Sequence, residues 1–457
     1  MADTIYVVAI DFGTAYSGYS FCVKSVTENI RSVFWGVEHG LRTQKTPTCI
    51  LFDESQKFIN FGYDAVMTYK RMNKSEAKMN YFFENFKMEL YNKTITRTMK
   101  VSAKNGKPLS ALKVFSESLR YMKDHVLKTI QEHSSKITVT VSDITWILTV
   151  PAIWDAGAKQ FMREAAMQAG LVPEFNSENL ILALEPEAAS VWCKQLPQEG
   201  FLTEGLSEDT LQCSPGLQYI VVDCGGGTID MTVHEVLENE GLKEIHKASG
   251  GNMGEINIDY ILLVGGYASC KFLQRRVQEQ FSSRCTVLCP IESQLAIAKG
   301  AVLFGNDPKI ITSRVSARTY GIATAVDFIP LKHPKEKRKV NRKGDYVYCD
   351  DVFHSFVKKG QSVDCNDISE YVFVPIDDDQ EEMRFNFYST ENENVMYIDD
   401  AGVKKIGSFD VPMPNTFLGR NRSVRFNVKF GLTELQATAT DLSSNQTQCI
   451  RLDFLTE

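Results

Sequence analysis

Two apolar runs of strand type each end at an aspartate that a glycine-bearing turn follows, at Asp11–Ser17 and at Asp223–Asp230. Such a run is typical of a buried strand that delivers a polar residue to a site. After the first turn, Tyr19–Val23 returns to strand character, which predicts a β-hairpin whose tip presents backbone N–H groups. One such hairpin can be purely structural, and the second copy favours a functional interpretation.

The residue types in these turns suit a phosphate chain held with a cation. Three consecutive glycines, Gly225–Gly227, would weaken an ordinary strand, so their useful property is close approach of the backbone to an anion. Aspartates beside such a turn would repel phosphate unless a cation lay between them. Because Mg²⁺ takes carboxylate, water and phosphate oxygens, the pair of hairpins predicts two lobes that grip one phosphate chain with magnesium.

Length, composition and charge narrow the class of protein. The 457 residues exceed one ordinary domain, and 43% hydrophobic and 23% charged residues are globular values. A net charge of −7 offers no basic excess, so nucleic acid is not an expected partner. No positive leader opens the chain and no uninterrupted run of about 18 apolar residues occurs, so neither secretion nor a membrane span is expected.

Cysteines and charge runs give weaker signals. Eleven cysteines, an odd number without a Cys-x-x-Cys pair, favour reduced thiols in the cytoplasm. Cys285 and Cys289 lie close enough to suggest zinc, but no second pair or His cluster accompanies them. The basic stretch Lys332–Lys343 is interpreted as a solvated loop, with a nuclear localisation signal as the alternative. The acidic stretch 377–382 is interpreted as a turn between strands.

Helix signals lie between the two hairpins. Asp155 is placed to cap a helix that Gly170 ends, after a buried strand predicted over Ser142–Pro151. Ser110 is placed to cap a longer helix whose apolar residues recur at spacings of three and four. Glu185 stands at the entrance of a third helix, where a carboxylate either offsets the helix dipole or positions a water in the site.

These motifs occur in the order found in heat shock protein 70 chaperones, which the sequence resembles: Asp11–Ser17, Thr149–Leu171, Glu185–Ala189, Asp223–Asp230 and Val264–Gly266. Trp154 and Lys247–Gly251 look closer to the divergent heat shock 70 kDa protein 12A/12B branch. The resemblance implies an α/β, actin-like (ribonuclease H-like) pair of lobes around ATP. It also implies a following β-sandwich-like domain that holds an extended peptide or an unfolded protein segment.

The resemblance also implies roles for single residues. Asp11 and Asp223 match aspartates that hold magnesium largely through water. Lys87 resembles the lysine near the γ-phosphate, with an exposed surface lysine as the alternative. Glu185 and Asp230 match the carboxylates that orient the attacking water and the metal. The positions that match the nucleotide contacts are Gly13, Thr14, Ala15, Tyr16, Gly225, Gly226, Gly227, Thr228, Gly265 and Gly266.

The sequence departs from the family in three places. Ala15 replaces a threonine and loses one hydroxyl contact, worth about 1 kcal/mol. Only Asn252–Tyr260 stands where relatives carry roughly a hundred residues, a domain-sized segment. That segment is the upper subdomain of the second lobe, which carries several side chains that sandwich adenine. Ser269 aligns with the adenine-stacking arginine, so the phosphate half of the site is retained and the adenine half is lost.

We therefore expect a first lobe over 1–180, a truncated second lobe over 181–305, a linker over 306–317 and a β-rich domain over 318–457. The function implied is an ATP-gated peptide-binding chaperone of the stress response, a weak ATPase yielding ADP and phosphate, with co-chaperones as further partners. A sugar kinase would not need the β-rich domain. The alternative is a non-catalytic interaction protein with impaired ATP binding. The missing upper subdomain of the second lobe has two competing explanations: a splice form or faulty gene model, and a real protein that has lost nucleotide gating.

Overall fold

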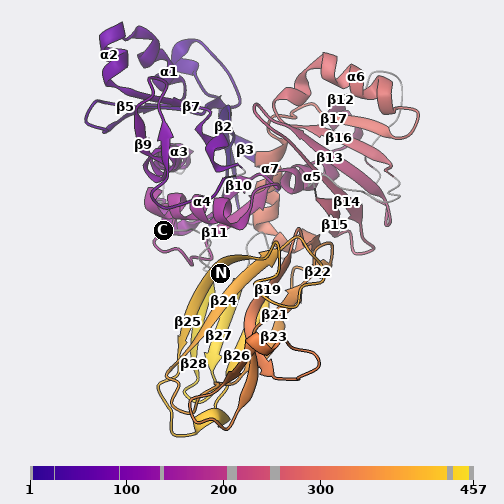
Figure 1. Ribbon diagram of the computed structural model, residues 1–457. Helices are drawn as coiled ribbons and strands as arrows, with labels where there is room; N and C mark the ends of the chain where they lie inside the picture. Colours follow the sequence, from indigo (N-terminus) through magenta and orange to yellow (C-terminus); the bar gives the residue numbers. More distant parts are fainter. Residues whose placement is uncertain are drawn as a thin grey trace. The chain divides into compact units, whose positions relative to one another are not determined.

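The computed structural model describes residues 4–24, 26–91, 93–133, 138–202, 211, 214–247, 258–429 and 436–451. The chain divides into two compact units, Met1–Ile311 and Thr312–Phe454. Figure 1 shows mixed helices and strands in the first unit and strands in the second. In the described residues, no helix combines the length and apolar character needed to cross a membrane.

The first sheet of unit 1 grows from the N-terminal hairpin. Strands β1 (Tyr6–Phe12) and β2 (Tyr16–Val23) are antiparallel, with Asp11 opposite Gly18. Strands β10 (Ile144–Val150) and β11 (Leu180–Leu184) continue the sheet in parallel with β1. The order is β11-β10-β1-β2-β3, with β3 at Arg31–Ser32, and β4 (Thr46–Pro47) also pairs with β2. The predicted first hairpin and the predicted strand before Pro151 are confirmed.

Two helices share one apolar core with this sheet. In α4 (Ala156–Ala169), Oδ1 of Asp155 accepts the N–H of Ala158 at 2.9 Å, and Gly170 ends the helix at φ 79°, as predicted. Helix α3 (Ala111–His133) begins directly after Ser110. Its apolar stripe is buried at spacings of three and four: Phe115, Leu119, Met122, Val126 and Ile130. The sequence pattern therefore located both helices correctly.

Smaller elements complete the first lobe. A three-stranded sheet has the order β6-β5-β7, and β8 pairs with β9. The bounds are β5 Cys49–Phe52, β6 Phe58–Phe61, β7 Tyr81–Glu84, β8 Lys100–Ser102, β9 Pro108–Ser110, α1 Gly62–Arg71, α2 Lys74–Met79, η1 Val37–His39, η2 Phe86–Leu90 and η3 Val141–Asp143.

The second lobe repeats the strand order of the first. Strand β13 (Gln218–Cys224) is antiparallel to β14 (Ile229–Val236), and β14 is antiparallel to β15 (Leu242–Lys247). On the other side β13 runs parallel to β16 (Tyr260–Val264), and β16 runs parallel to β17 (Thr286–Pro290). The order β17-β16-β13-β14-β15 matches β11-β10-β1-β2-β3, which indicates an internal duplication. The remaining elements are α6 Lys271–Phe281, β12 Phe201–Leu202, η4 Gln198–Gly200 and η5 Tyr267–Ser269.

Two helices pack against each other between the duplicated sheets. Helix α5 (Glu185–Lys194) follows β11, and α7 (Ala296–Asn306) follows β17. A Cβ built at Gly300 would lie 1.7 Å from the carbonyl oxygen of Ala188, so the α7 backbone touches the α5 backbone directly. Only glycine leaves room for this approach.

Unit 2 consists of antiparallel sheets around an aromatic core. One sheet has the order β20-β21-β19-β24-β25 and another β23-β26-β27-β28. Phe356, Phe385 and Phe426 lie in the core. The bounds are β19 Thr319–Asp327, β20 Arg338–Val340, β21 Val347–Val357, β22 Ser362–Asp364, β23 Ser369–Phe373, β24 Glu382–Thr390, β25 Lys404–Pro412, β26 Val424–Lys429, β27 Gln436–Asp441, β28 Gln446–Arg451, η7 Lys335–Lys337 and η8 Gly419–Asn421. At the boundary between the units, η6 (Pro308–Ile310) belongs to unit 1, and β18 (Ile311–Val315) begins at the last residue of unit 1.

The charged stretches of unit 2 face each other. The N–H of Arg342 donates to Asp377 at 2.8 Å, its guanidinium pairs with Asp379 at 3.0 Å, and Lys343 pairs with Asp378. The acidic turn therefore neutralises the end of the basic stretch, a pairing that neither stretch predicts alone. Residues 306–317, expected as a linker, hold the end of α7, η6 and strand β18.

We predict that Gly300→Ala lowers the free energy of unfolding by about 1–3 kcal/mol, because the added methyl group must push α5 and α7 apart. Chemical denaturation followed by tryptophan fluorescence measures this, since all four tryptophans lie in unit 1. The control is Gly266→Ala, at φ −65° with no atom within 4 Å of the added Cβ. Equal stability of the two variants would contradict the packing argument.

Candidate functional site

The tip of the first hairpin is held by a threonine from a neighbouring segment. Oγ1 of Thr48 donates to the carbonyl of Gly13 at 2.8 Å, and the N–H of Thr48 donates to the carbonyl of Ala15 at 2.8 Å. A Cβ at Gly13 would lie 2.2 Å from the carbonyl oxygen of Tyr16, so the turn needs glycine. The turn is thus fixed by backbone contacts rather than by the side chains of Thr14 and Tyr16.

The tip of the second hairpin meets the first. Inside the turn, the N–H of Gly225 donates to the carbonyl of Thr228 at 3.0 Å. A Cβ at Gly226 would lie 2.5 Å from Cβ of Ala15, and one at Gly227 would lie 2.9 Å from the Thr14 methyl group. The two duplicated hairpins therefore face each other tip to tip across the lobes, as the sequence predicts for a shared phosphate site.

A third glycine turn packs against the second hairpin. Gly265 has φ +90°, and a Cβ there would lie 2.2 Å from Oδ1 of Asp223. The N–H of Gly265 donates to the carbonyl of Ser293 at 3.0 Å. The Gly265–Gly266 turn therefore brings backbone directly against the carboxylate of Asp223, which no side chain would permit.

Asp11 lies at the end of β1 with a cation beside it. Its Oδ2 is 2.6 Å from Nζ of Lys45, and its Oδ1 accepts the hydroxyl of Thr149 at 3.3 Å. Both Asp11 and Lys45 are largely buried. The Lys45 contact was not predicted from the sequence, because Lys45 precedes an ordinary Thr-Pro pair and reaches Asp11 only through the pairing of β2 with β4.

Glu185 and Lys87 form a buried ion pair. Nζ of Lys87 is 2.7 Å from Oε1 of Glu185, and the two side chains are 3% and 9% exposed. The same ammonium lies 5.2 Å from the centre of the Trp154 ring, a cation–π contact. The alternative in which Lys87 is an exposed surface lysine is therefore wrong, because η2 turns the residue into the protein interior.

Burial and mutual repulsion raise the pKa of two carboxyl groups. Desolvation raises the pKa of Glu185, and the charges of Asp11 and Asp230 raise it further against the effect of Lys87. Desolvation raises the pKa of Asp223 well above its usual range, and Glu185 and Asp11 add to the shift. These shifts place all four carboxylates within electrostatic reach of one another. Asp230 also accepts the N–H of Ala152.

The cluster fits a divalent cation. Lys45 pairs with Asp11 and Lys87 pairs with Glu185, and the charges of Asp223 and Asp230 belong to the same buried group of carboxylates. Among the described residues, no donor reaches the buried Oδ1 of Asp223. Hard oxygen ligands with excess negative charge are what Mg²⁺ requires. The chain's residues therefore fit the predicted magnesium, while their individual roles stay predictions.

The predicted adenine side is less complete. Ser269 is exposed, and its hydroxyl donates to the carbonyl of Gly266 at 2.9 Å rather than standing free. The predicted join at 252–260 lies mostly outside the described residues. The structure thus brings together the residues predicted to bind phosphate and metal, and position 269 offers a hydroxyl instead of a cation that could stack on a base.

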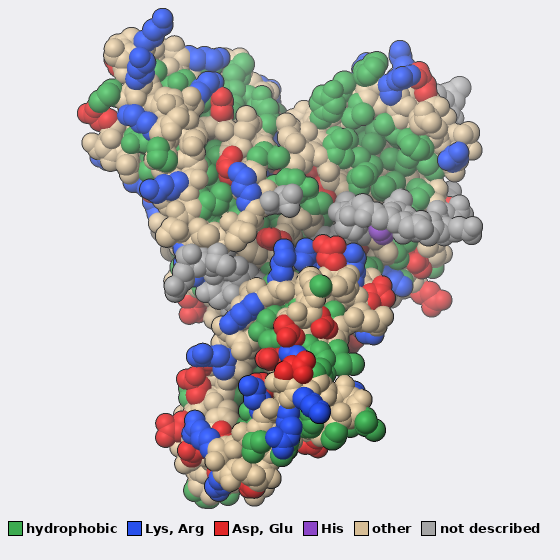
Figure 2. All heavy atoms as spheres, in the orientation of Figure 1, with side chains coloured by type: hydrophobic (Ala, Val, Ile, Leu, Met, Phe, Trp, Pro, Cys, Tyr) green, Lys and Arg blue, Asp and Glu red, His purple; other side chains and the backbone are tan. Residues whose placement is uncertain are grey.

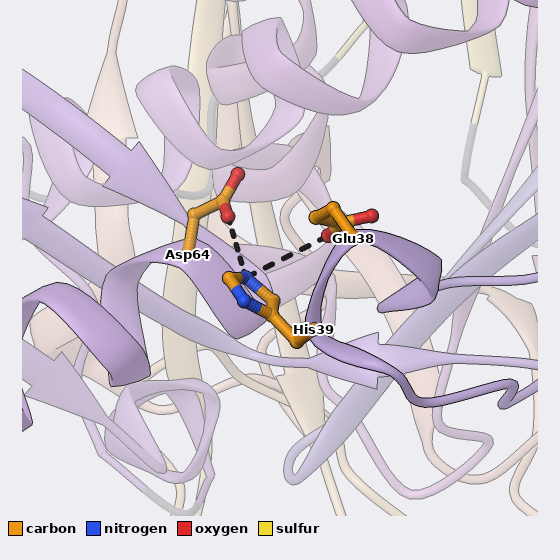
Figure 3. A group of neighbouring side chains, drawn as sticks. All are labelled: Glu38, His39 and Asp64. Carbon is orange, nitrogen blue, oxygen red and sulfur yellow. Dashed lines mark hydrogen bonds and ion pairs between the residues drawn. The ribbon is translucent and has the colours of Figure 1, made fainter.

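Another group with metal-ligand chemistry lies elsewhere in the first lobe. Figure 3 shows His39 between Glu38 and Asp64, with Nε2 of His39 2.8 Å from Oδ1 of Asp64 and 3.7 Å from Oε1 of Glu38. Both carboxylates face the same ring nitrogen, and their side chains are 59% and 41% exposed. This arrangement is a surface ion pair that ties η1 to α1 rather than a second site.

Curated proteins similar to this chain include heat shock 70 kDa proteins 12A and 12B. Heat shock 70 kDa protein 12A of Mus musculus is 30% identical over 621 residues, covering 99% of this chain and 92% of that protein, and 12A of Homo sapiens gives the same values. Heat shock 70 kDa protein 12B of Homo sapiens is 30% identical over 626 residues, covering 98% and 91%. No protein-family model matches the chain.

Solved structures with some likeness include MreB5 of Spiroplasma citri bound to ADP, at 10% identity and a TM-score of 0.38, covering 66% of this chain and 96% of that one. A non-polymerising mutant of MamK bound to AMPPNP has 10% identity and a TM-score of 0.36, covering 67% and 100%. Likeness at this level carries no argument about the present protein.

The duplicated sheets, the facing hairpins and α5 packed on α7 define a two-lobed protein of the actin-like α/β fold, here followed by antiparallel β-sheets. The identity to the 12A and 12B proteins is decisive for the family. The chain belongs to the heat shock protein 70 family, in its 12A/12B-like branch. The alignment with the mouse protein spans 621 positions, whereas this chain has 457 residues. A domain-sized part of the mouse protein therefore has no counterpart in this chain.

We predict that Asp223→Asn raises the thermal stability of the metal-free protein at neutral pH. A carboxyl group whose folded pKa is raised stabilises the fold below its unfolded pKa and loses that effect as pH rises through the folded pKa. The gain in melting temperature should therefore be small near pH 4 and grow toward pH 8, measured in EDTA.

The control for this prediction is Asp143→Asn. Hydrogen bonds from Thr140 lower the pKa of Asp143, so the wild-type carboxylate stabilises the fold above its unfolded pKa and loses that effect on acidification. This variant should lower the melting temperature at neutral pH. A pH-independent effect of Asp223→Asn would contradict the proposed charge repulsion.

Proposed function

We propose that this protein binds Mg²⁺ and ATP between its two hairpins and hydrolyses ATP slowly. The observation that carries the proposal is the buried group of four carboxylates beside two glycine turns that meet tip to tip. Asp11 and Asp223 would hold magnesium through water, and the bound ion would neutralise phosphate charge. The backbone N–H groups of Gly13–Tyr16 and Gly225–Thr228 would bind the phosphate oxygens.

The ion pair of Lys87 with Glu185 suits an attacking water. Glu185 is buried at the first turn of α5, and desolvation raises its pKa, which makes the carboxylate a better proton acceptor. Lys87, held by Glu185 and Trp154, would direct its charge toward the terminal phosphate. Asp230 is fixed by the Ala152 N–H and would orient water or metal. Placement rather than covalent chemistry is what phosphoryl transfer demands of a protein.

We expect Glu185→Gln and Asp230→Asn to reduce ATP turnover by roughly 10²–10³-fold while leaving binding of magnesium-ATP within a few-fold, because neither carboxylate is proposed to contact the nucleotide itself. Isothermal calorimetry measures binding, and phosphate release measures turnover. Lys93→Gln, an exposed lysine of the same lobe, is the control. Full turnover in both carboxylate variants would contradict the proposed roles.

Unit 2 is the proposed peptide-binding part. Strand β23 lies at the edge of its sheet in the described part of unit 2, pairing there with β26 alone. Val372 and Val374 are 57% and 61% exposed along this edge. An extended peptide can add to such an edge through main-chain hydrogen bonds and place apolar side chains beside the valines. Nucleotide binding in unit 1 would change the affinity of unit 2 for the peptide. The protein would act in the cytoplasm, with co-chaperones as further partners.

We expect a fluorescent, leucine-rich heptapeptide to bind with an affinity that changes at least five-fold on adding magnesium-ATP, a typical coupling between sites. Val372→Asp with Val374→Asp should abolish peptide binding, because two charges would line the edge. Phe417→Asp, an exposed apolar residue of the same unit, is the control. If ATP binds and peptide affinity stays constant, the gating is disproved while the ATP site stands.

A non-catalytic interaction protein is the second candidate. It is favoured by the exposed Ser269 in place of a stacking arginine and by the domain-sized part of the relatives that has no counterpart here. Calorimetry that shows no heat with magnesium-ATP for this chain, and clear heat for a version with that part restored, would establish this second candidate.

A further inference from the structure

The internal duplication lets each position of the second lobe be compared with its counterpart in the first. Tyr19 lies opposite Ile10, directly before Asp11, and Met231 lies opposite Val222, directly before Asp223. Ser17 lies opposite Phe12, and Ile229 lies opposite Cys224. Tyr19 and Met231 are therefore equivalent, as are Ser17 and Ile229.

In the first lobe, α3 packs against this face of the sheet. Tyr19 is 1% exposed, and its hydroxyl lies 2.8 Å from both Nδ1 of His125 and Oγ1 of Thr129 on α3. Phe12 meets the Phe115 ring of the same helix at 5.9 Å between centroids. The helix thus closes the sheet with its apolar stripe and adds polar contacts at one end.

In the second lobe the described residues cover the equivalent face only in part. Met231 is 40% exposed and Ile229 is 62% exposed, against 1% and 0% for Tyr19 and Ser17. Ile220 and Val222 on β13 are only half-buried. Figure 2 shows hydrophobic side chains gathered over the sheet of this lobe below α6. The segment between Lys247 and Tyr260 is shorter in sequence than α3.

We propose that this open face, made by Ile220, Val222, Ile229 and Met231, binds an amphipathic α-helix of a partner protein. The occupant is a helix because the duplicated lobe shows what closes this sheet, namely a helix with an apolar stripe at spacings of three and four. An exposed apolar patch on a folded protein marks an interaction site, and an apolar groove on a fold takes such a helix through its stripe. Ile229 and Met231 flank Asp230 in β14, and because successive side chains of a strand point to opposite faces, this face lies on the other side of the sheet from the Asp230 carboxylate.

The contacts of α3 in the first lobe indicate which partner helix would fit the open face of the second lobe. It carries apolar residues at the positions of Phe115, Leu119 and Met122, and it lies across β13 and β14 as α3 lies across β1 and β2. Where Tyr19 offers a hydroxyl to α3, Met231 offers a flexible thioether, so the second-lobe face selects apolar bulk rather than hydrogen-bonding partners. The expected partner segment is thus more uniformly apolar on its stripe than α3 itself.

The test uses the full chain and a labelled synthetic peptide with the sequence of residues 110–133, the one helix known to close such a sheet. Fluorescence anisotropy should show saturable binding, and circular dichroism should show the peptide gaining helix on binding. Ile229→Glu with Met231→Glu should weaken binding at least ten-fold. Both side chains are exposed, so this variant should fold, and Met231→Ser alone provides a milder version.

Matched controls distinguish specific binding at this face from non-specific hydrophobic binding. A peptide with Met122→Lys and Val126→Lys should not bind, and Ile291→Glu, an exposed apolar residue elsewhere on the second lobe, should bind the native peptide normally. Binding that survives Ile229→Glu with Met231→Glu, or no binding to the native chain, would overturn the proposal. Dimerisation that this double variant abolishes would also overturn it, because the occupant would then be a second copy.

Discussion

Four carboxyl groups buried close together between two lobes are the constraint on which the rest of unit 1 depends. Asp11 and Asp223 stand at the ends of duplicated strands, so the repeat that builds the sheets also brings like charges together. Lys45 and Lys87 offset part of the repulsion among these carboxylates. Desolvation, together with the repulsion from neighbouring carboxylates, raises the pKa values of Glu185 and Asp223. Strongly shifted pKa values of this kind cluster at functional sites.

Local signals made much of this architecture predictable. The apolar runs before Asp11 and Asp223, the Asp155 cap and the Gly170 stop each act within a few residues, and each is found where the sequence places it. The stripe of α3 is equally local, since its period alone decides which side chains are buried.

What the sequence did not reveal depends on distant pairings. Lys45 reaches Asp11 through a strand pair, and Lys87 is buried because Glu185 and Trp154 arrive from other segments. The basic stretch that ends at Lys343 pairs with an acidic turn from another part of unit 2. Nothing in the local pattern carries such information, since each contact joins residues that only the folded chain brings together.

Ala15 lies at the contact between the two hairpin tips, where the size of its side chain matters. A Cβ at Gly226 would already lie 2.5 Å from the methyl group of Ala15, so the two tips have no space left between them. A threonine at position 15 would add two heavy atoms at this point and act as a spacer between the lobes. Alanine leaves only a methyl group at this contact, so the size of this one side chain decides how closely the two tips can meet.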